Sequence, residues 1–289
     1  MKKKLLLATA LLFLTVLSWA QPAITPNKTP AYLAFRQEGR LPMISAHRGG
    51  RFIPGYPENA LETFGLTLRQ APAMIECDIS MSRDSVLFLL HDNTLDRTTN
   101  GHGRADSTDW ATIQGLYLYD DFGHATPYRI PRLEDALLWC KHNAALFTLD
   151  VKRGVPFPMV AAAVDAAGVA DNTIMITYNL EDALEVHRLA PHAIISVNIR
   201  NEQELDNYLA SGIPPGQLIA FTGLQQRSME FYKKLHDKGI PAIIGTMGNL
   251  DTKAMVRGPQ TYLSLFRAGA DIFATDRPLD VYQAVNGLQ

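Results

Sequence analysis

Cysteine is scarce in this sequence: only two cysteines, Cys77 and Cys140, occur among its 289 residues. No cluster of cysteines and histidines has the spacing of a zinc site. Cys77 lies in a predicted strand and Cys140 in a predicted helix, and in an oxidising compartment the two could form a disulfide. We favour the alternative that both are small, buried apolar residues.

Two further absences exclude broad classes of protein. The chain has no excess of basic residues, because 27 lysines and arginines stand against 29 aspartates and glutamates. Nonspecific nucleic-acid binding needs a basic face, so we expect no nucleic-acid partner. The chain also lacks a Gly-x-Ser-x-Gly motif, which argues against a serine hydrolase of the lipase type.

Long apolar runs are missing except at the N-terminus. Three lysines precede the run Leu5–Leu17, and Ser18-Trp19-Ala20 follows it. This order is typical of a secretory signal peptide, so we predict that residues 1–20 are removed by cleavage after Ala20 and that the mature protein is periplasmic or secreted. The alternative is a membrane anchor, but the run is shorter than the roughly 20 residues that span a bilayer. No cysteine follows it, as a lipoprotein anchor would require, and we expect no stable membrane anchor.

The remaining chain alternates between β-like runs and helical patterns, after a lead-in at residues 21–42 that is rich in proline, alanine, threonine and glutamine. Strand and helix alternating eight times predicts a closed parallel (β/α)8 TIM barrel, which uses about 250 residues as one domain. No linker or repeat divides residues 43–289, which we therefore take as one domain. The eight predicted strands are Met43–His47, Met74–Ser80, Leu146–Val151, Thr173–Tyr178, Ala193–Asn198, Gln217–Phe221, Pro241–Gly245 and Asp271–Thr275.

A ninth β-like run, Ser85–His91, does not fit this count. Only about four residues separate it from the strand Met74–Ser80, whereas a parallel return needs a crossover of a dozen or more. We therefore predict an antiparallel hairpin arm that brings His91 back roughly level with Asp78. Residues 92–130 follow as a long loop insertion, and loops of that length are often functional.

Polar side chains gather where the predicted strands end. The active site of a (β/α)8 barrel lies at the C-terminal ends of its strands, so these side chains should share one mouth. They are His47 and Arg48 after the first strand, Glu76 and Asp78 on the second, His91 and Asp92 on the hairpin arm, Asp150 and Lys152 on the third strand, and Asp276 after the last.

The spacing of the acidic residues indicates a metal site. Glu76 and Asp78 are two apart and share one side of their strand, as do Asp150 and Lys152. These pairs could be a solvent-facing edge and a simple ion pair. In a closed barrel, however, one side is the interior, where several carboxylates cannot all stay ionised unless a cation joins them. Three oxygen ligands suit a hard ion such as Ca²⁺ or Mg²⁺.

The other groups suit a phosphodiester substrate. Arg48 offers a planar fork for phosphate oxygens and Lys152 a point charge. Either histidine alone could be an ordinary hydrogen-bonded residue. Together, His47 and His91 could remove a proton from a nucleophile and donate one to a leaving group.

Several of these segments resemble the glycerophosphodiester phosphodiesterase family. The resemblance runs from Ile44 to about Pro278 and is most specific in its first hundred residues. The segments that carry it are AHRGG, PENALETF, IECDISMSRDSVLFLLHDNTLDRTTNGHG, TLDVK and ADIFATDRP.

The resemblance implies a distorted (β/α)8 barrel that uses a divalent cation, commonly Ca²⁺ or Mg²⁺, to hydrolyse glycerophosphodiesters to glycerol 3-phosphate and an alcohol. In such enzymes two histidines act as acid and base, and the glycerol 2-hydroxyl attacks phosphorus to give a cyclic phosphate. Carried over by position, the histidines are His47 and His91, the metal ligands are Glu76 and Asp78, and Arg48 and Lys152 hold the phosphate. Glu58 matches a glutamate that we expect to organise His47 or Arg48, or to reach the metal through water.

The chain departs from this family pattern at three places. Asp150 stands where the family usually has a longer glutamate, which makes direct metal contact through Asp150 less certain. Gly245-Thr246-Met247 stands where the family often has Trp-Thr, and Tyr178-Asn179 where it often has Ser-Phe. We expect the last two changes to affect which alcohol is accepted rather than the chemistry.

Two other functions remain open from the sequence. One is a related phosphodiesterase that acts on phospholipid or on another diester. The other is a non-catalytic barrel that binds phosphodiesters, although a pure binder has no need of paired proton-transfer groups. In each case the partner is a small molecule, and the sequence makes no prediction of the oligomeric state.

Overall fold

The computed structural model describes residues 41–286. The predicted signal peptide, residues 1–20, and nearly all of the predicted lead-in, residues 21–42, lie outside the described residues. Within residues 41–286, no helix combines the length and the apolar character that crossing a bilayer requires.

Eight parallel strands close into a barrel, as the alternation predicted. Each strand pairs with the next along the chain, and β1 closes the ring by pairing with both β2 and β11. The strands are β1 (Met43–Ala46), β2 (Met74–Met81), β6 (Phe147–Val151), β7 (Thr173–Ile176), β8 (Ile194–Asn198), β9 (Leu218–Phe221), β10 (Ala242–Gly245) and β11 (Ile272–Thr275).

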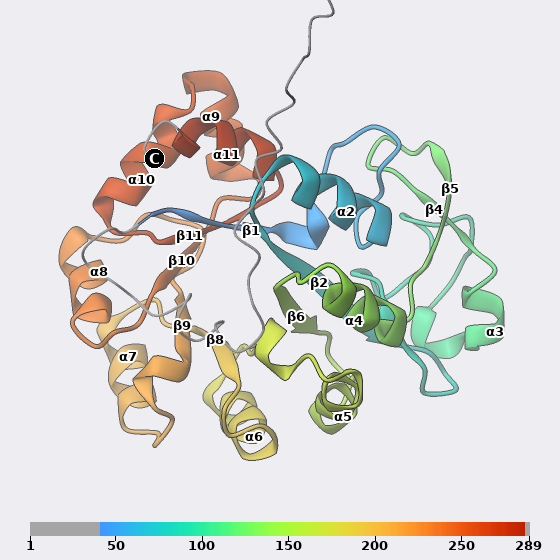
Figure 1. The fold of residues 1–289 in the computed structure, drawn as a ribbon, viewed down its shortest axis with the longest axis horizontal. Helices are drawn as coiled ribbons and strands as arrows, with labels where there is room; N and C mark the ends of the chain where they lie inside the picture. The colour runs from blue at the N-terminus through green and yellow to red at the C-terminus, as the bar shows by residue number, and fades with distance from the viewer. Residues whose placement is uncertain (1–40, 287–289) are drawn as a thin grey trace, which may run out of the picture.

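Helices surround this ring on the outside (Figure 1). Side chains cap the starts of three helices: Asn179, Asn201 and Ser228 accept hydrogen bonds from backbone N–H groups in the first turns of α6, α7 and α8. The helices are α2 (Leu61–Gln70), α4 (Leu133–His142), α5 (Phe157–Ala167), α6 (Leu180–Leu189), α7 (Glu202–Leu209), α8 (Met229–His236), α9 (Asn249–Arg257), α10 (Gln260–Ala268) and α11 (Pro278–Val285).

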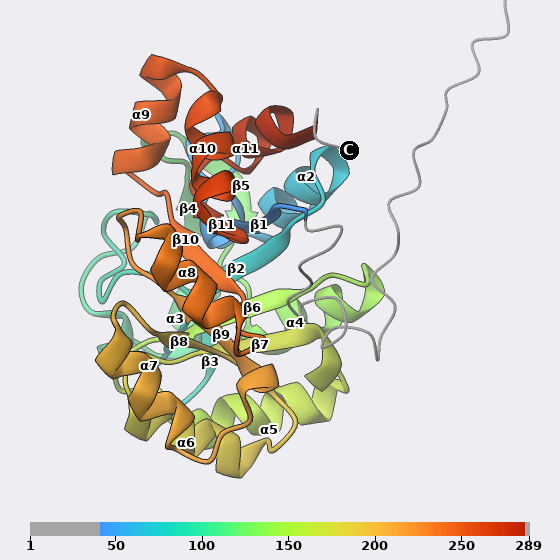
Figure 2. The same cartoon turned by 90° about the vertical axis from the view of Figure 1, so that its left-hand side faces the viewer.

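Residues 249–268 form two helices, α9 and α10, rather than one continuous helix. Gly258 has a φ of 94°, which ends α9, and Pro259 follows. Proline lacks the N–H that a continuing helix needs, so α10 starts anew. In the side view α9, α10 and α11 lie across the strands from α5 and α6 (Figure 2).

The barrel interior is apolar at the bottom and polar at the top. A buried cluster of Met74, Leu146, Ile174, Ile194, Ile219, Ile243 and Ile272 fills the end where the strands begin. Two residues further along, the inward positions include the small side chains Ser45, Thr148, Ser196 and Ala274. Parallel pairing then sets Glu76 beside Thr148 and Asp78 beside Asp150. A filled floor under small residues leaves space at the mouth of the barrel.

The two cysteines are free and buried, as we favoured. Both belong to the apolar layer between the strands and the surrounding helices. Cys77 therefore points away from the interior that Glu76 and Asp78 face, because successive residues of a strand alternate sides.

The antiparallel hairpin arm is also confirmed. β3 (Leu87–Leu89) pairs antiparallel with β2, and the N–H of Leu90 donates to the carbonyl of Asp78 at 3.0 Å. Ser85, at a φ of 63°, turns the chain between the two strands. His91 follows Leu90 and so returns to the level of the acidic residues on β2.

The insertion at residues 92–130 has regular structure that the sequence did not predict. It contains the short helix α3 (Trp110–Ile113) and a separate two-stranded sheet of β4 (Tyr117–Tyr119) and β5 (Ala125–Arg129). A small apolar core, separate from that of the barrel, joins Leu95 and Ile113 of the insertion to Phe88 of β3. Figure 1 shows these elements to one side of the barrel, outside its ring of strands.

Candidate active site

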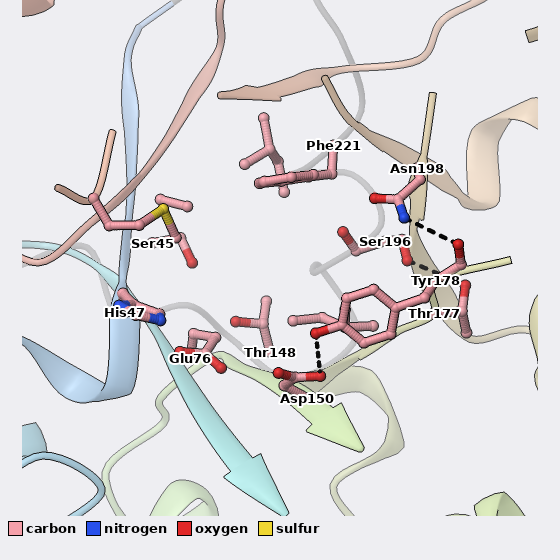
Figure 3. A pocket seen from close by; sticks show the side chains of 14 residues that line it. Ser45, His47, Glu76, Thr148, Asp150, Thr177, Tyr178, Ser196, Asn198 and Phe221 are labelled. Atoms are coloured by element: carbon pink, nitrogen blue, oxygen red, sulfur yellow. Dashed lines mark hydrogen bonds between the residues drawn. The ribbon is translucent and has the colours of Figure 1, made fainter. Parts of the chain in front are cut away.

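Three acidic side chains meet inside the mouth of the barrel. Glu76 and Asp78 come from β2 and Asp150 from β6, all three are buried, and one carboxylate oxygen of each lies within 4.8 Å of the others. Figure 3 shows Glu76 and Asp150 at one side of the cavity with Phe221 across from them. The three carboxylates meet inside the barrel, as the spacing of Glu76 and Asp78 predicted, and Asp150 and Lys152 also form the ion pair that was the alternative.

Glu76 and Asp78 are each held by a donor from the loop after β1. The backbone N–H of Arg48 donates to Oε2 of Glu76 at 2.7 Å. Asn59 makes two bonds to Asp78, since its Nδ2 donates to Oδ2 at 2.7 Å and its Oδ1 accepts from the backbone N–H at 3.0 Å. Asn59 has a φ of 57°, a conformation that asparagine tolerates better than most residues. Both carboxylates are therefore fixed in orientation.

Asp150 is held from two sides. The Tyr178 hydroxyl donates to its Oδ1 at 2.7 Å, and Nζ of Lys152 donates to its Oδ2 at 2.6 Å. Lys152 also lies 2.6 Å from Oδ1 of Asp78. A single ammonium group thus joins two of the three acids.

The pKa values of Glu76 and Asp78 are shifted in opposite directions. Burial first, and then the charges of Asp78 and Asp150, raise the pKa of Glu76 well above its usual value. Burial alone would raise the pKa of Asp78 as well, but the charges of Lys152 and Arg48 outweigh it, and the pKa is lowered. A hard divalent cation would relieve the repulsion that remains, and three carboxylates suit such an ion.

His47 is oriented by the carboxylate of Asp276, which directly follows β11. It begins the short 3₁₀ turn η1 (His47–Gly49) and lines the cavity, and its Nδ1 lies 2.7 Å from Oδ1 of Asp276. Gly49 permits this turn because a Cβ there would lie 2.2 Å from the Phe64 ring. Burial alone would raise the pKa of Asp276, but His47 and Arg51 outweigh it and lower the pKa, so the carboxylate is the acceptor.

His91 has a matching arrangement. Its Nδ1 lies 2.7 Å from Oδ1 of its neighbour Asp92. The guanidinium of Arg97 donates to both oxygens of Asp92, at 2.7 and 2.9 Å. These bonds first, and His91 second, hold the pKa of Asp92 well below its usual range. Each of the two histidines thus has its Nδ1 paired with an ionised carboxylate.

Glu58 connects the acidic cluster with the surroundings of His91, because it binds arginines from both places. It accepts hydrogen bonds from Arg48 at 2.9 and 3.1 Å and from Arg97 at 2.8 and 3.0 Å, and Arg51 lies 3.1 Å away. Burial would raise its pKa, but Arg97, Arg48 and Arg51 lower it. Of the roles expected for Glu58, the structure shows the contact with Arg48.

Arg48 and Lys152 both lie at the acidic cluster. Arg48 is 7% exposed, is anchored by Glu58, and places its Nε 3.5 Å from Asp78. The two cations bring positive charge to the place where a phosphate would meet the carboxylates, and their contact with phosphate stays a prediction.

A cavity of about 140 Å³ opens beside the carboxylates. Its far wall is apolar and includes Phe221 and Met247, while Ile243 of the floor also lines the cavity. Gly245 backs this wall: a Cβ there would lie 2.5 Å from Leu224 and 2.9 Å from Met247. Asp150, Tyr178 and Met247 all line the cavity, so each of the three places where the sequence departs from the family pattern borders it.

Three residues of the site, Asn59, Arg97 and Asp276, had no role predicted from the sequence, and Tyr178 had one only in the choice of alcohol. Asn59 directly follows Glu58, and Asp276 was placed at the mouth without a function. Arg97 lies in the insertion, whose path the sequence did not predict. Only proximity in the folded chain pairs these residues with Asp78, Asp92, Asp150 and His47.

Comparison with known proteins agrees with this geometry. The model of the "Glycerophosphoryl diester phosphodiesterase family" matches residues 47–278. A crystal structure of a glycerophosphoryl diester phosphodiesterase from Parabacteroides distasonis has a TM-score of 0.83 at 31% identity, over 90% of this chain and 91% of that one. An uncharacterised Bacillus subtilis protein, YqiK, is 28% identical over 81% of this chain and 95% of its own length.

A more distant structure shares the fold. It is a phosphodiesterase from Oleispira antarctica in complex with the product sn-glycerol-3-phosphate, with a TM-score of 0.65 at 19% identity, over 85% of this chain and 97% of that one.

Proposed function

The chain belongs to the glycerophosphoryl diester phosphodiesterase family, and on that premise we propose how its site hydrolyses glycerophosphodiesters. In this proposal, a divalent cation, Ca²⁺ or Mg²⁺, is bound at Glu76, Asp78 and Asp150. His47 and His91 act as acid and base, and the products are glycerol 3-phosphate and an alcohol. The product complex of the Oleispira antarctica phosphodiesterase supports the first of these products.

The observation that carries the proposal is the pairing of both histidines with carboxylates. Because Asp276 and Asp92 each accept from a histidine Nδ1, the Nε2 atoms of His47 and His91 remain for proton transfer. A binding protein has no need of two histidines held in this way. The pairing therefore supports catalysis over the alternative of a non-catalytic barrel.

The three carboxylates fit a cation for the reasons of charge and ligand type given above. A bound divalent cation would neutralise charge that develops on the phosphate oxygens in the transition state. Glu76, Asp78 and Asp150 each offer an oxygen toward their common centre. Arg48 and Lys152, both at the edge of this cluster, would add positive charge on the substrate side.

The proton movements follow from the two histidines. One histidine takes the proton of the glycerol 2-hydroxyl as its oxygen bonds to phosphorus, and the other protonates the alcohol oxygen as its bond to phosphorus breaks. Water then opens the resulting cyclic phosphate: it gives a proton to the second histidine, and the first returns its proton to the glycerol oxygen. One water is consumed, and both histidines end as they began.

A second substrate class is favoured by the far wall of the cavity. Phe221 and Met247 line the cavity, and Leu224, which is 49% exposed, continues this apolar surface toward solvent. Such a surface suits diesters whose alcohol carries hydrocarbon, including single-chain phospholipids. These compounds belong in the substrate panel below.

We also propose that the enzyme acts outside the cytoplasm, on the pattern of residues 1–20 alone. N-terminal sequencing of the mature protein tests this directly. The expected first residue is Gln21, and a protein that retains Met1 would contradict the proposal.

The experiment for the function is a product assay on metal-free protein. Glycerophosphodiesters of choline, ethanolamine, inositol and glycerol, and a single-chain phospholipid, are each incubated with Ca²⁺, with Mg²⁺ or with chelator. We expect glycerol 3-phosphate and free alcohol from at least one diester with a cation, and none with chelator. Full activity after exhaustive chelation would show that the reaction needs no divalent cation. Release of a phosphorylated alcohol would show that the bond between phosphorus and the alcohol oxygen is not the one that breaks.

A further inference from the structure

Each acid of the cluster has one oxygen tied to a fixed donor. The donor is the backbone N–H of Arg48 for Glu76 and the amide of Asn59 for Asp78. For Asp150 it is the hydroxyl of Tyr178, at 2.7 Å (Figure 3). Tyr178 is thus the third member of a set whose other members orient metal ligands.

Tyr178 is well placed to hold Asp150 still. Asp150 lies opposite Ile176 in the pairing of β6 with β7, so Tyr178, two residues further, leaves the adjacent strand on the same side. Asn198 donates to the backbone carbonyl of Tyr178 at 3.0 Å, which fixes the start of the loop that follows β7. The hydroxyl therefore reaches Asp150 from a tethered backbone.

The two oxygens of Asp150 face different partners. Oδ1 accepts from Tyr178, while Oδ2 lies on the side of Lys152, which also contacts Asp78. Loss of the hydroxyl would remove the hydrogen bond that restrains rotation of the carboxylate about its χ2 angle, a broad torsion. Partners outside the ligand set generally fix ligand orientation in this way.

We propose that Tyr178 is a positioning residue that orients Asp150 for divalent-cation binding, an inference that rests on the metal site proposed above. Sequence analysis gave Tyr178 a role in alcohol choice, which its ring, 55% exposed and lining the cavity, can also have. Replacement of Tyr178 by phenylalanine separates the two roles, because phenylalanine keeps the ring and removes the hydroxyl.

The test is cation affinity of the complete, metal-free protein, measured without substrate. Ca²⁺ is titrated by calorimetry, and Tb³⁺, a trivalent probe of similar ligand preference, is used so that weakened variants remain measurable. We expect Tyr178→Phe to bind both ions about 10- to 100-fold more weakly, the usual loss when such a partner is removed. Its activity should rise toward the wild-type rate as Ca²⁺ is increased.

A double substitution shows whether the effect passes through Asp150. In an Asp150→Ala background, adding Tyr178→Phe should change Tb³⁺ affinity by no more than about twofold, because the shared contact is already gone. Tyr262→Phe is the matched control. This substitution also removes a tyrosine hydroxyl that donates to a buried carboxylate, that of Asp251, which lies outside the acidic cluster. Thermal stability should therefore fall while cation affinity stays at the wild-type value.

Unchanged cation affinity in Tyr178→Phe would overturn the inference. So would an equal loss with and without Asp150, because Tyr178 would then act by another path. Absence of Ca²⁺ and Tb³⁺ binding in the wild-type protein would overturn the proposed metal site itself, and this inference with it, so the wild-type titration distinguishes the two failures.

Discussion

The Nδ1 atom of His47 lies 2.7 Å from Oδ1 of Asp276, a residue 229 positions later in the chain. Asp276 is itself held, since its backbone N–H donates to Oδ2 of Asp251 at 3.0 Å. Asp251 also accepts from Thr275 and Tyr262. A buried network at the end of β11 therefore sets the orientation of a histidine at the end of β1.

Asp276→Asn should impair catalysis without unfolding the protein. An amide in place of the carboxylate no longer favours the tautomer with Nδ1 protonated, and it no longer stabilises a charged imidazole. We expect kcat to fall by about 100- to 10,000-fold, the range that positioned acid–base groups supply, with KM changed little. Steady-state kinetics at saturating cation measures both. A kcat near the wild-type value would show that this hydrogen bond does not serve catalysis.

Arg97→Gln should change how stability depends on pH. Asp92 and Glu58 both have lowered pKa values, and hydrogen bonds from Arg97 are a leading cause for each. These two carboxylates therefore bind protons at a higher pH in the unfolded chain than in the folded protein. Their contribution to stability is complete above about pH 5 and decreases as the pH falls below the unfolded-state pKa values near 4. The variant should lose about 1–2 kcal/mol at pH 7, and its deficit should shrink toward pH 3.

Arg83→Gln is the control for that experiment. Arg83 makes a similar pair with Asp109, but on an exposed surface, where solvent screens the pair and it contributes little to stability. Urea unfolding across the pH range gives both comparisons. A constant deficit for Arg97→Gln from pH 7 to pH 3 would rule out this electrostatic account.

Glu76→Gln should stabilise the metal-free protein while removing its response to cation. Burial and the charges of Asp78 and Asp150 raise the pKa of Glu76, so ionised Glu76 costs stability, and that cost grows as pH rises above its unfolded value. The neutral amide removes the cost, and each 1 kcal/mol of relieved repulsion should raise Tm by about 2–4 °C. Thermal scans in chelator and in Ca²⁺ measure both effects. A lower metal-free Tm with a full Ca²⁺ shift would contradict the prediction.

Met247→Ala should alter which alcohol is preferred and leave the chemistry intact. Met247 lines the cavity beside Gly245, away from the carboxylates. Loss of its side chain should change the ratio of kcat/KM between diesters of different alcohols by about 3- to 10-fold, a size usual for one apolar contact. Kinetics over the substrate panel provides the ratios. An equal loss for every alcohol would place Met247 among the groups that support the reaction itself.

Much of this fold could be predicted from the sequence because its signals are local and periodic. The eight barrel strands and the hairpin arm follow from short apolar runs and from the length of the connections between them. The insertion at residues 92–130 could not be read this way, since β4 and β5 are too short for a clear pattern. The pair Gly258-Pro259 marks the break between α9 and α10 in the sequence itself.

The residues of the site can likewise be separated into those whose neighbours follow from local spacing and those whose neighbours do not. Glu76 and Asp78 could be paired from spacing alone, because alternate residues of a strand share a side. The contacts of Asp276 with His47 and of Arg97 with Glu58 could not be predicted, because each forms only when segments far apart in the sequence meet at the mouth of the barrel. Tyr178 marked a departure from the family pattern, but its contact with Asp150 depends on the pairing of β6 with β7.

The most direct measurement is ³¹P NMR of glycerophosphodiester hydrolysis by the wild-type enzyme, His47→Ala and His91→Ala, each with saturating Ca²⁺ and each shown to be folded by circular dichroism. The account predicts conversion to glycerol 3-phosphate by the wild-type enzyme and a rate at least about 100-fold lower in both variants, because each histidine supplies one proton transfer. Near wild-type turnover in either folded variant would contradict the assignment of His47 and His91 as the acid–base pair.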